Sequence, residues 1–317
     1  MRVRSVILLS LAILIIASIG VSWVVQPIDD LWVENPFWNG LSDVQTILKP
    51  VRLSGLENAE LLSSNSTIMM LGPSLAYSET EITSMRSYLE DGGRIVLTDD
   101  FGTGNSLLAG LGLNARFSGQ LLRDELFKER KMMPRIFLVE ASPETIGVKE
   151  LVFNYPTVLT GVKADEALAY ASFFSEVSNS TGVGPFPVMA LLKMGKGSII
   201  LISDSSIFIN GMLDQGDNLI LLKNLQRGAL FIDEAHSAQS RLAQFRNFSA
   251  AAYGLFNHPE IKYSLAAVLI VGVFKVRWED MDEQPDEVEE TLRRRPEWSR
   301  RELEELREAR RRAHGEN

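Results

Sequence analysis

Two short apolar runs separated by an amphipathic segment form the clearest pattern in the chain. Residues 67–71 and 94–98 have the length of buried strands. Ser78 begins the segment between them, and Glu81 follows three residues later, which is the spacing of a helix capping box. Apolar residues then recur at helical spacing, at Ile82, Met85 and Leu89. Two strands joined through one helix predict a parallel β-α-β unit and hence an α/β fold.

Weaker apolar segments extend this unit in both directions. Residues 188–193 and 198–202 flank a glycine-containing turn and predict a β-hairpin, and residues 229–232 predict a last strand. Other strands are expected at residues 51–53, 135–139 and 151–153, and other helices at residues 42–48 and 218–225. Ser42 and Asp217 are expected to cap those two helices. Together these elements predict a mostly parallel sheet flanked by helices.

A continuous uncharged apolar run fills residues 5–25, which is about the length that spans a bilayer. Arg2 and Arg4 precede it, so the positive-inside rule predicts a cytoplasmic N-terminus. A cleaved signal peptide is the alternative. Residues 263–274 form a second, shorter apolar run, expected to be a transmembrane helix or, alternatively, a buried or re-entrant helix. The two runs predict a two-pass cell-membrane protein with both termini cytoplasmic and the main domain extracytoplasmic.

The apolar and charged segments divide the chain into six expected regions. These are a cytoplasmic N-terminus at 1–4, a transmembrane helix at 5–25, an extracytoplasmic domain at 26–236, an amphipathic linker at 237–260, a transmembrane helix at 261–276 and a charged cytoplasmic tail at 277–317. The tail has too few apolar residues to build a core. Ser299 and Glu302 nevertheless have capping-box spacing, which predicts a helix over residues 300–312.

Charge and composition narrow the functional classes. The formal net charge is −9, which argues against a nucleic-acid-binding protein because phosphate contacts need a basic face. The chain has no cysteine, so disulfides, thiolate metal sites and cysteine nucleophiles are excluded. The turn at residues 195–198 lacks the first glycine of a phosphate-binding loop. No cofactor is therefore predicted.

Polar residues follow four of the predicted strands. In open α/β sheets, ligands bind at the carboxyl ends of the strands. If the four strands are parallel neighbours, one edge gathers a largely acidic set of candidate ligand-binding residues: Ser74, Asp99, Asp100, Gly102, Asp204, Ser205, Asn218, Asp233, Glu234 and His236. Their oxygen atoms suit a hard cation or the basic groups of a partner. The alternative is structural, because Asp and Ser after strands commonly cap helices and close turns.

No member of this set is predicted to be catalytic or is assigned as a metal ligand. His236, near Asp233, has the composition of an acid–base or metal pair, or equally of a supporting hydrogen bond. Ser74 lacks the Gly-x-Ser-x-Gly pattern of a serine nucleophile, as does Ser205. Asp99 and the adjacent Asp100 would repel each other in a cleft, so one is expected to cap the next helix while the other faces a ligand.

The order of several short motifs resembles that of the membrane-anchored prokaryotic proteins of domain-of-unknown-function family 4350. The matching motifs are Asn35-Pro36 to Gly40, Gly72-Pro73, Asp91-Gly92-Gly93 with the strand at 94–98, Asp204 to Asn210, Asp217-Asn218, Asp233-Glu234-Ala235-His236 and Asn257-His258-Pro259. The likeness covers residues 30–278. It implies a class I glutamine amidotransferase-like sandwich between two membrane helices. The turn at residues 99–102, where the amidotransferase cysteine would lie, has none, which excludes glutamine hydrolysis by a thiolate.

The residues and the resemblance together predict a catalytically silent binding or scaffold module in a membrane-associated complex. Its expected partners are membrane or envelope proteins and the lipid bilayer, and the resemblance implies an accessory role in a transporter or in a system with a MoxR-type ATPase. The alternative is a metal-dependent hydrolase that uses the acidic edge. Bound divalent metal would favour the hydrolase, and a stoichiometric partner without metal would favour the binding module. The oligomeric state stays open.

Overall fold

A computed structural model describes residues 3–130, 132–178, 182–237, 240–264, 266–267, 270–271 and 287–314. Internal contacts divide the chain into two units, Met1–Asn247 and Phe248–Asn317, and each is described by itself. The predicted apolar run at 263–274 and the first part of the charged tail lie in part outside the described residues.

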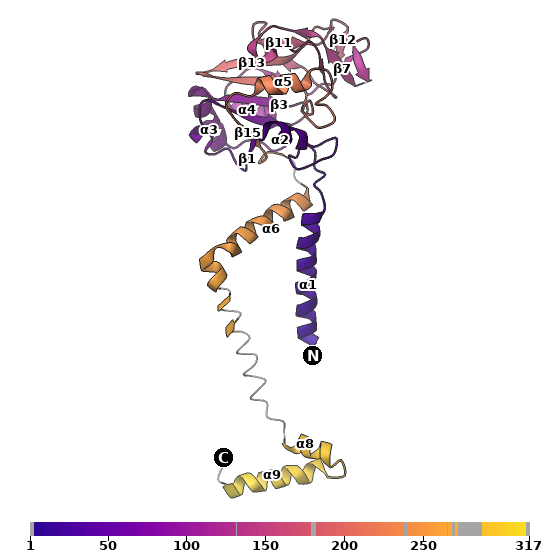
Figure 1. Ribbon diagram of the computed structural model, residues 1–317, viewed down its shortest axis with the longest axis vertical. Coiled ribbons are helices and arrows are strands. Elements are labelled where there is room, and N and C mark those ends of the chain that lie inside the picture. The colour runs from indigo at the N-terminus through magenta and orange to yellow at the C-terminus, as the bar shows by residue number, and fades with distance from the viewer. Residues whose placement is uncertain are drawn as a thin grey trace. The chain divides into compact units, whose positions relative to one another are not determined.

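A large β-sheet forms the centre of the first unit (Figure 1). It has eight strands in the order β1-β15-β2-β3-β14-β13-β11-β8. The bounds are β1 Val51–Leu53, β15 Ala229–Asp233, β2 Ser66–Leu71, β3 Arg94–Thr98, β14 Gly197–Ile202, β13 Pro187–Met194, β11 Ala167–Tyr170 and β8 Leu138–Val139. The strands from β1 to β14 pair in parallel. Ile68 of β2 lies opposite Ile95 of β3, so the predicted parallel pair is confirmed.

The expected mostly parallel sandwich is wrong, because antiparallel pairing is extensive. β13 pairs antiparallel with both β14 and β11, and β11 pairs antiparallel with β8. Three small antiparallel sheets are also present. The first pairs β4 Arg116–Phe117 with β10 Leu159–Thr160, and the second pairs β5 Leu122–Asp124 with β12 Ser175–Val177. In the third, β7 Met133–Ile136 lies between β6 Lys128–Arg130 and β9 Leu151–Val152. The lengths of the connections explain the antiparallel pairing. Parallel neighbours must be joined by a long crossover, whereas antiparallel neighbours can be joined by a tight turn. Gly195, at φ 58°, allows such a turn between β13 and β14.

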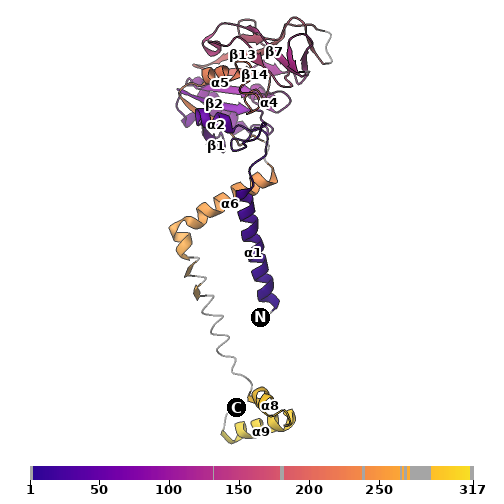
Figure 2. The same ribbon diagram turned by 45° about the vertical axis from the view of Figure 1, so that its right-hand side comes forward.

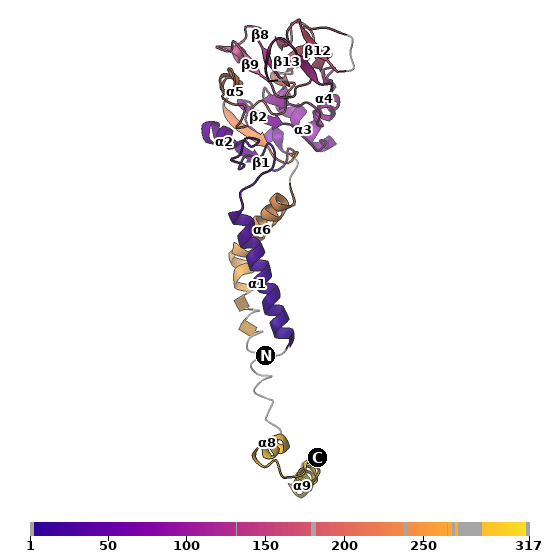
Figure 3. The same ribbon diagram turned by 90° about the vertical axis from the view of Figure 1, so that its right-hand side faces the viewer.

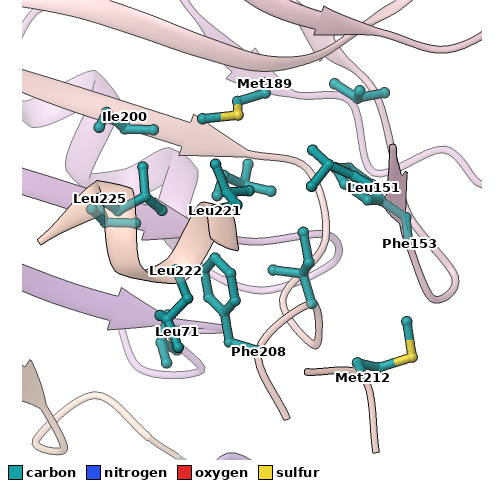
Figure 4. Close-up of a cluster of buried hydrophobic side chains, with 14 of the residues drawn as sticks. Leu71, Leu151, Phe153, Met189, Ile200, Phe208, Met212, Leu221, Leu222 and Leu225 are labelled. Atoms are coloured by element: carbon teal, nitrogen blue, oxygen red, sulfur yellow. The ribbon is translucent and has the colours of Figure 1, made fainter. Parts of the chain in front are cut away.

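Helices cover both faces of the large sheet (Figure 3). On one side lie α2 Ser42–Leu48 and α5 Asn218–Leu225, and on the other lie η1 Ala59–Leu61, α3 Glu79–Glu90 and α4 Gly104–Gly110. A short helix, η2 Pro143–Thr145, follows β8. Successive strand residues point to opposite faces, so Met69 enters one core and Met70 the other. In the first core, Leu221 and Leu225 of α5 pack with Ile200 of β14 (Figure 4).

The predicted helix cap at α3 is confirmed and the one at α2 is wrong, while Asp217 occupies the capping position of α5 without bonding to that helix. At α3, Ser78 Oγ accepts a hydrogen bond from Glu81 N (3.3 Å), and a Glu81 carboxylate oxygen accepts one from Ser78 N (2.9 Å). At α5, the Asp217 carboxylate instead accepts hydrogen bonds from the backbone N–H groups of residues 149 and 150. At α2, Leu41 occupies the capping position and Ser42 is the first helical residue.

The membrane topology is corrected. Residues 3–24 form helix α1 Val3–Val24, and residues 241–257 form α6 Arg241–Asn257. Nowhere in the described part of the chain is a helix both long enough and apolar enough to cross a membrane. The predicted transmembrane helices, and with them the two-pass location with cytoplasmic termini and an extracytoplasmic domain, are therefore not supported.

The second unit contains two charged helices, α8 Glu287–Arg294 and α9 Arg300–His314 (Figure 2). The helix predicted over residues 300–312 is confirmed and extends slightly further. Arg300 of α9 forms a 2.8 Å ion pair with Glu289 of α8, so the two helices pack as a hairpin.

Candidate functional site

The four strands followed by polar residues are neighbours: β15, β2, β3 and β14 lie side by side and run parallel. We call the shared end where these strands finish the carboxyl edge. The residues there form two groups, one after β3 and β14 and the other after β15 and β2.

Asp99 is the first residue after β3, and its carboxylate is fully engaged by hydrogen bonds from the backbone of its own loop. One carboxylate oxygen accepts hydrogen bonds from the backbone N–H groups of Asp100 and Gly102, and the other accepts one from Gly104, each at 2.8 Å. Its side chain is buried, which raises the pKa of Asp99 although the three backbone donors oppose this. A Cβ on Gly102 or Gly104 would come within 2.6 or 2.7 Å of this carboxylate, so glycine is required at both positions.

Asp100 is the member of the acidic pair that reaches the surface. One carboxylate oxygen accepts a hydrogen bond from Ser205 Oγ after β14 (2.7 Å), and the other accepts one from Phe101 N (2.7 Å). Its side chain is only partly buried. One carboxylate of the pair was expected to cap the next helix, and Asp99 does accept a hydrogen bond from Gly104 N at the start of that helix. That Asp100 faces a ligand stays a prediction.

Asp204, which follows β14, is completely buried. It accepts hydrogen bonds from Asn154 N (2.6 Å), Ser206 N (2.8 Å) and Ser206 Oγ (2.9 Å). Burial, with a smaller contribution from the charge of Asp100, raises the pKa of Asp204 from 3.8 to about 7. The side chain ties the loop after β14 to residue 154 and does not face solvent.

Asp204 predicts a specific dependence of stability on pH. The native carboxyl retains its proton up to about pH 7, whereas the unfolded carboxyl loses it near pH 3.8, so stability falls as the pH rises between those values. One proton contributes a slope of at most about 1.4 kcal/mol per pH unit. Urea denaturation from pH 4 to 8 should show a flatter profile for Asp204→Asn than for the wild type. The exposed Asp214→Asn serves as the control, and an unchanged slope for Asp204→Asn would contradict this account.

His236, after β15, lies between two carboxylates. Its Nδ1 is 2.9 Å from Asp233 Oδ2, its Nε2 is 3.4 Å from Glu81 Oε1, and its ring stacks on Tyr77 with centroids 4.0 Å apart. Burial lowers the pKa of His236, but the hydrogen bonds and charges of the two carboxylates outweigh it and raise the pKa overall. Because both ring nitrogens face carboxylates, the His236 side chain links the end of β15 to α3.

Sequence reasoning missed the roles of Glu81 and Tyr77 in this second group. Glu81 was visible only as a capping residue, although the same carboxylate group also reaches His236. Tyr77 lies in the loop before α3 and is buried. Both residues come from the beginning of a helix, and a search of strand ends alone cannot find them.

The remaining predicted residues are also engaged by their neighbours. Ser74 donates its hydroxyl to the backbone carbonyl of His236 (3.1 Å). Glu234 forms an ion pair with Arg52 of β1. Asn218 does not belong to the carboxyl edge group: its amide donates to the backbone carbonyls of Val152 (2.8 Å) and Met212 (3.0 Å), where it holds α5 to β9.

Within the residues that the structure describes, no group of three or more His, Asp or Glu side chains is placed to hold a metal ion. The carboxylates of the edge are directed at backbone N–H groups, at hydroxyls and at basic side chains. The geometry gives no observation in favour of the metal-dependent hydrolase.

An exposed part of the carboxyl edge surrounds Asp100. Phe101 is 56% exposed, and Leu75 on the neighbouring loop is 55% exposed. The two loops touch, because Thr103 Oγ1 donates a hydrogen bond to the backbone carbonyl of Leu75 (2.8 Å). We call the surface formed by Leu75, Asp100, Phe101 and Ser205 the edge patch. It carries a hydrogen-bonded carboxylate and hydroxyl, and its two touching loops bear two exposed apolar side chains.

Comparison with solved structures finds several proteins that resemble part of this chain at low sequence identity. The N-terminal domain of mmIFT52 is 15% identical, with 51% of this chain and 78% of that chain covered and a TM-score of 0.41. A β-galactosidase from Bacillus circulans sp. alkalophilus is 14% identical (50% and 22% covered, TM-score 0.30), and α-L-fucosidase isoenzyme 2 from Paenibacillus thiaminolyticus is 14% identical (50% and 23% covered, TM-score 0.26). The match thus spans less than a quarter of either glycosidase, and these scores carry no argument about function.

Sequence comparison is more informative. No curated protein sequence matches the chain. A family profile described as a domain of unknown function, DUF4350, matches residues 33–225, which include β1 to β14, α5 and the residues of the edge patch. This match covers more than half of the 317 residues and agrees with the resemblance drawn from the motifs. The chain belongs to the DUF4350 family.

Proposed function

We propose that the chain is a binding module that recognises a partner protein through the edge patch and carries out no reaction there. The observation that supports this proposal is that the buried polar side chains of the carboxyl edge are bonded to other groups of the fold. Asp99, Asp204 and Asp233 each accept hydrogen bonds from within the fold, and His236 has a carboxylate at each ring nitrogen. A general acid or base must reach the proton that it transfers, and these groups are buried and already engaged.

The edge patch has the chemistry of a protein-binding surface. Aromatic side chains are enriched at protein interfaces, and a few well-packed anchor residues dominate the binding energy there. Phe101 would supply such an anchor, and the exposed Leu75 would add apolar contact area. Asp100, already oriented by Ser205 at 2.7 Å, would accept a hydrogen bond from an arginine or lysine of the partner. The partner segment expected here is therefore basic and apolar in composition.

The loop after β3 supports the same proposal. In the amidotransferase-like arrangement implied by the resemblance, this turn would present the nucleophile. Here its first residue, Asp99, is buried and bonded to the loop backbone, and the exposed residue at its tip is Phe101. We propose that the loop retains its position and serves binding in place of catalysis.

Photo-crosslinking in cells that naturally produce the protein tests this function. A benzophenone amino acid replaces Phe101 in the full chain, and its crosslinked products are identified by mass spectrometry. We expect one major protein adduct, formed reproducibly. The matched control carries the benzophenone at Ile146, which is 68% exposed.

Ile146 is a suitable control because it lies at the opposite end of the strands. The adjacent η2 residue Glu144 forms a 2.7 Å ion pair with Arg94, the first residue of β3. A label there should give no adduct with the same protein. Identical adducts from both positions, or none from position 101, would contradict binding through the edge patch.

A further inference from the structure

The hairpin of α8 and α9 leaves apolar side chains uncovered. Among the described apolar residues of 248–317, Val288 alone is buried. Leu306 is 63% exposed and Trp298 is 47% exposed, while Leu303 is only partly buried. A helix pair of this size buries too little apolar surface to be stable by itself, so a further surface is needed to cover these residues.

The apolar side chains lie along two adjoining hollows that differ in charge. One is lined by Trp298, Leu303 and Leu306 together with three glutamates: Glu297, Glu302 and Glu305. The other shares Leu303 and Leu306 and is lined by Arg307 and Arg310, with Glu287 and Val288 of α8. The same leucine pair therefore has an acidic surrounding toward the start of α9 and a more basic one further along the helix.

We propose that this hairpin is a self-association site, and that the exposed Leu303–Leu306 surface is covered by the same surface of a second copy of this chain. In a two-fold arrangement each surface meets itself in the opposite direction. The leucines of the two copies then meet at the axis, and the glutamate-lined hollow of each copy faces the arginine-lined hollow of its partner. Opposite charges flanking an apolar strip select the partner and its orientation. This inference is independent of the function proposed for the edge patch.

The oligomeric state of the full chain tests the proposal. Sedimentation velocity between about 1 and 100 μM should show a concentration-dependent dimer, since exposed surfaces of this size give moderate affinity. Leu306→Asp should weaken dimerisation at least about tenfold, because a charge would be placed in the apolar contact. Ala309→Asp, on an exposed part of the same helix outside both hollows, should change it far less.

Reversing the charges beside the leucines distinguishes this dimer from dimers formed through other surfaces. The double variant Glu302→Arg/Glu305→Arg should not dimerise, nor should Arg307→Glu/Arg310→Glu, whereas a mixture of the two should restore a heterodimer. Glu304→Arg, an exposed change of the same sign that touches neither hollow, is the control. A wild-type chain that stays monomeric to 100 μM, or a dimer that Leu306→Asp and both double variants leave intact, would overturn the proposal. Urea denaturation of each variant confirms that the α/β domain remains folded.

Discussion

Asp99→Ala is expected to lower the free energy of unfolding by about 3 kcal/mol, because it leaves three backbone N–H groups without their acceptor. The carboxylate of Asp99 receives Asp100 N, Gly102 N and Gly104 N at 2.8 Å each, and its side chain is 1% exposed. Water can replace the acceptor only where the loop is open, and Gly104 N lies in a buried position. The effect should appear as a lower urea midpoint with an unchanged slope.

Asp100→Ala is the matched control for this change. It removes the same chemical group one residue away, but the Asp100 side chain is partly exposed and its two partners, Ser205 Oγ and Phe101 N, lie near the surface. We expect a loss below about 1 kcal/mol, as for most surface substitutions. Equal destabilisation by the two variants would mean that the acidic pair is not divided between a structural and an exposed member.

His236→Gln is expected to have the second large effect, a loss of about 3 kcal/mol or more at pH 6, because it leaves two buried carboxylates without their cation. Asp233 Oδ2 lies 2.9 Å from Nδ1, and Glu81 Oε1 lies 3.4 Å from Nε2. Both carboxylates are almost fully buried. The measurement is urea denaturation of the variant beside the wild type, with His258→Gln, a change at an exposed histidine, as the control.

The effect of His236→Gln should also depend on pH. The pKa of His236 is raised in the folded state above its ordinary value of 6.5. Its stabilising contribution is therefore fully present below about pH 6.5 and is lost as the pH rises through the higher folded-state pKa. The difference in stability between wild type and variant should narrow in that range. A difference that stays constant from pH 5 to pH 9 would show that His236 is not held as a cation between these carboxylates.

Strong local patterns made the centre of the fold predictable. β3 and α5 have the predicted bounds, and the capping box of Ser78 and Glu81 forms as its spacing indicates. The parallel pairing of β2 with β3 was predicted from the helix between them, whereas the structure alone shows that β15 and β14 lie on either side of this pair. The small antiparallel sheets could not be predicted in the same way, because strands of two or three residues, such as β4 and β5, are too short to show a period.

The candidate site was predictable in place and not in chemistry. Its residues do gather at the carboxyl edge, with the exception of Asn218, whose amide binds backbone carbonyls elsewhere. What each carboxylate does depends on loops that come from distant parts of the sequence. Asn154 N donates to Asp204 from 50 residues away in the sequence, and Glu81 reaches His236 from helix α3. No local sequence pattern predicts such contacts. The sequence alone therefore could not distinguish a metal site from a capped loop or a binding surface.

We propose that the carboxyl edge divides into a buried structural part and an exposed binding part. Crosslinking from position 101 measures this most directly when it is repeated in an Asp100→Asn chain and in an Asp204→Asn chain. We predict that Asp100→Asn removes most of the partner adduct while the urea midpoint stays close to that of the wild type, and that Asp204→Asn alters the pH dependence of stability while folded protein still gives the adduct. An adduct that survives Asp100→Asn unchanged, or that disappears only when the protein unfolds, would contradict the account.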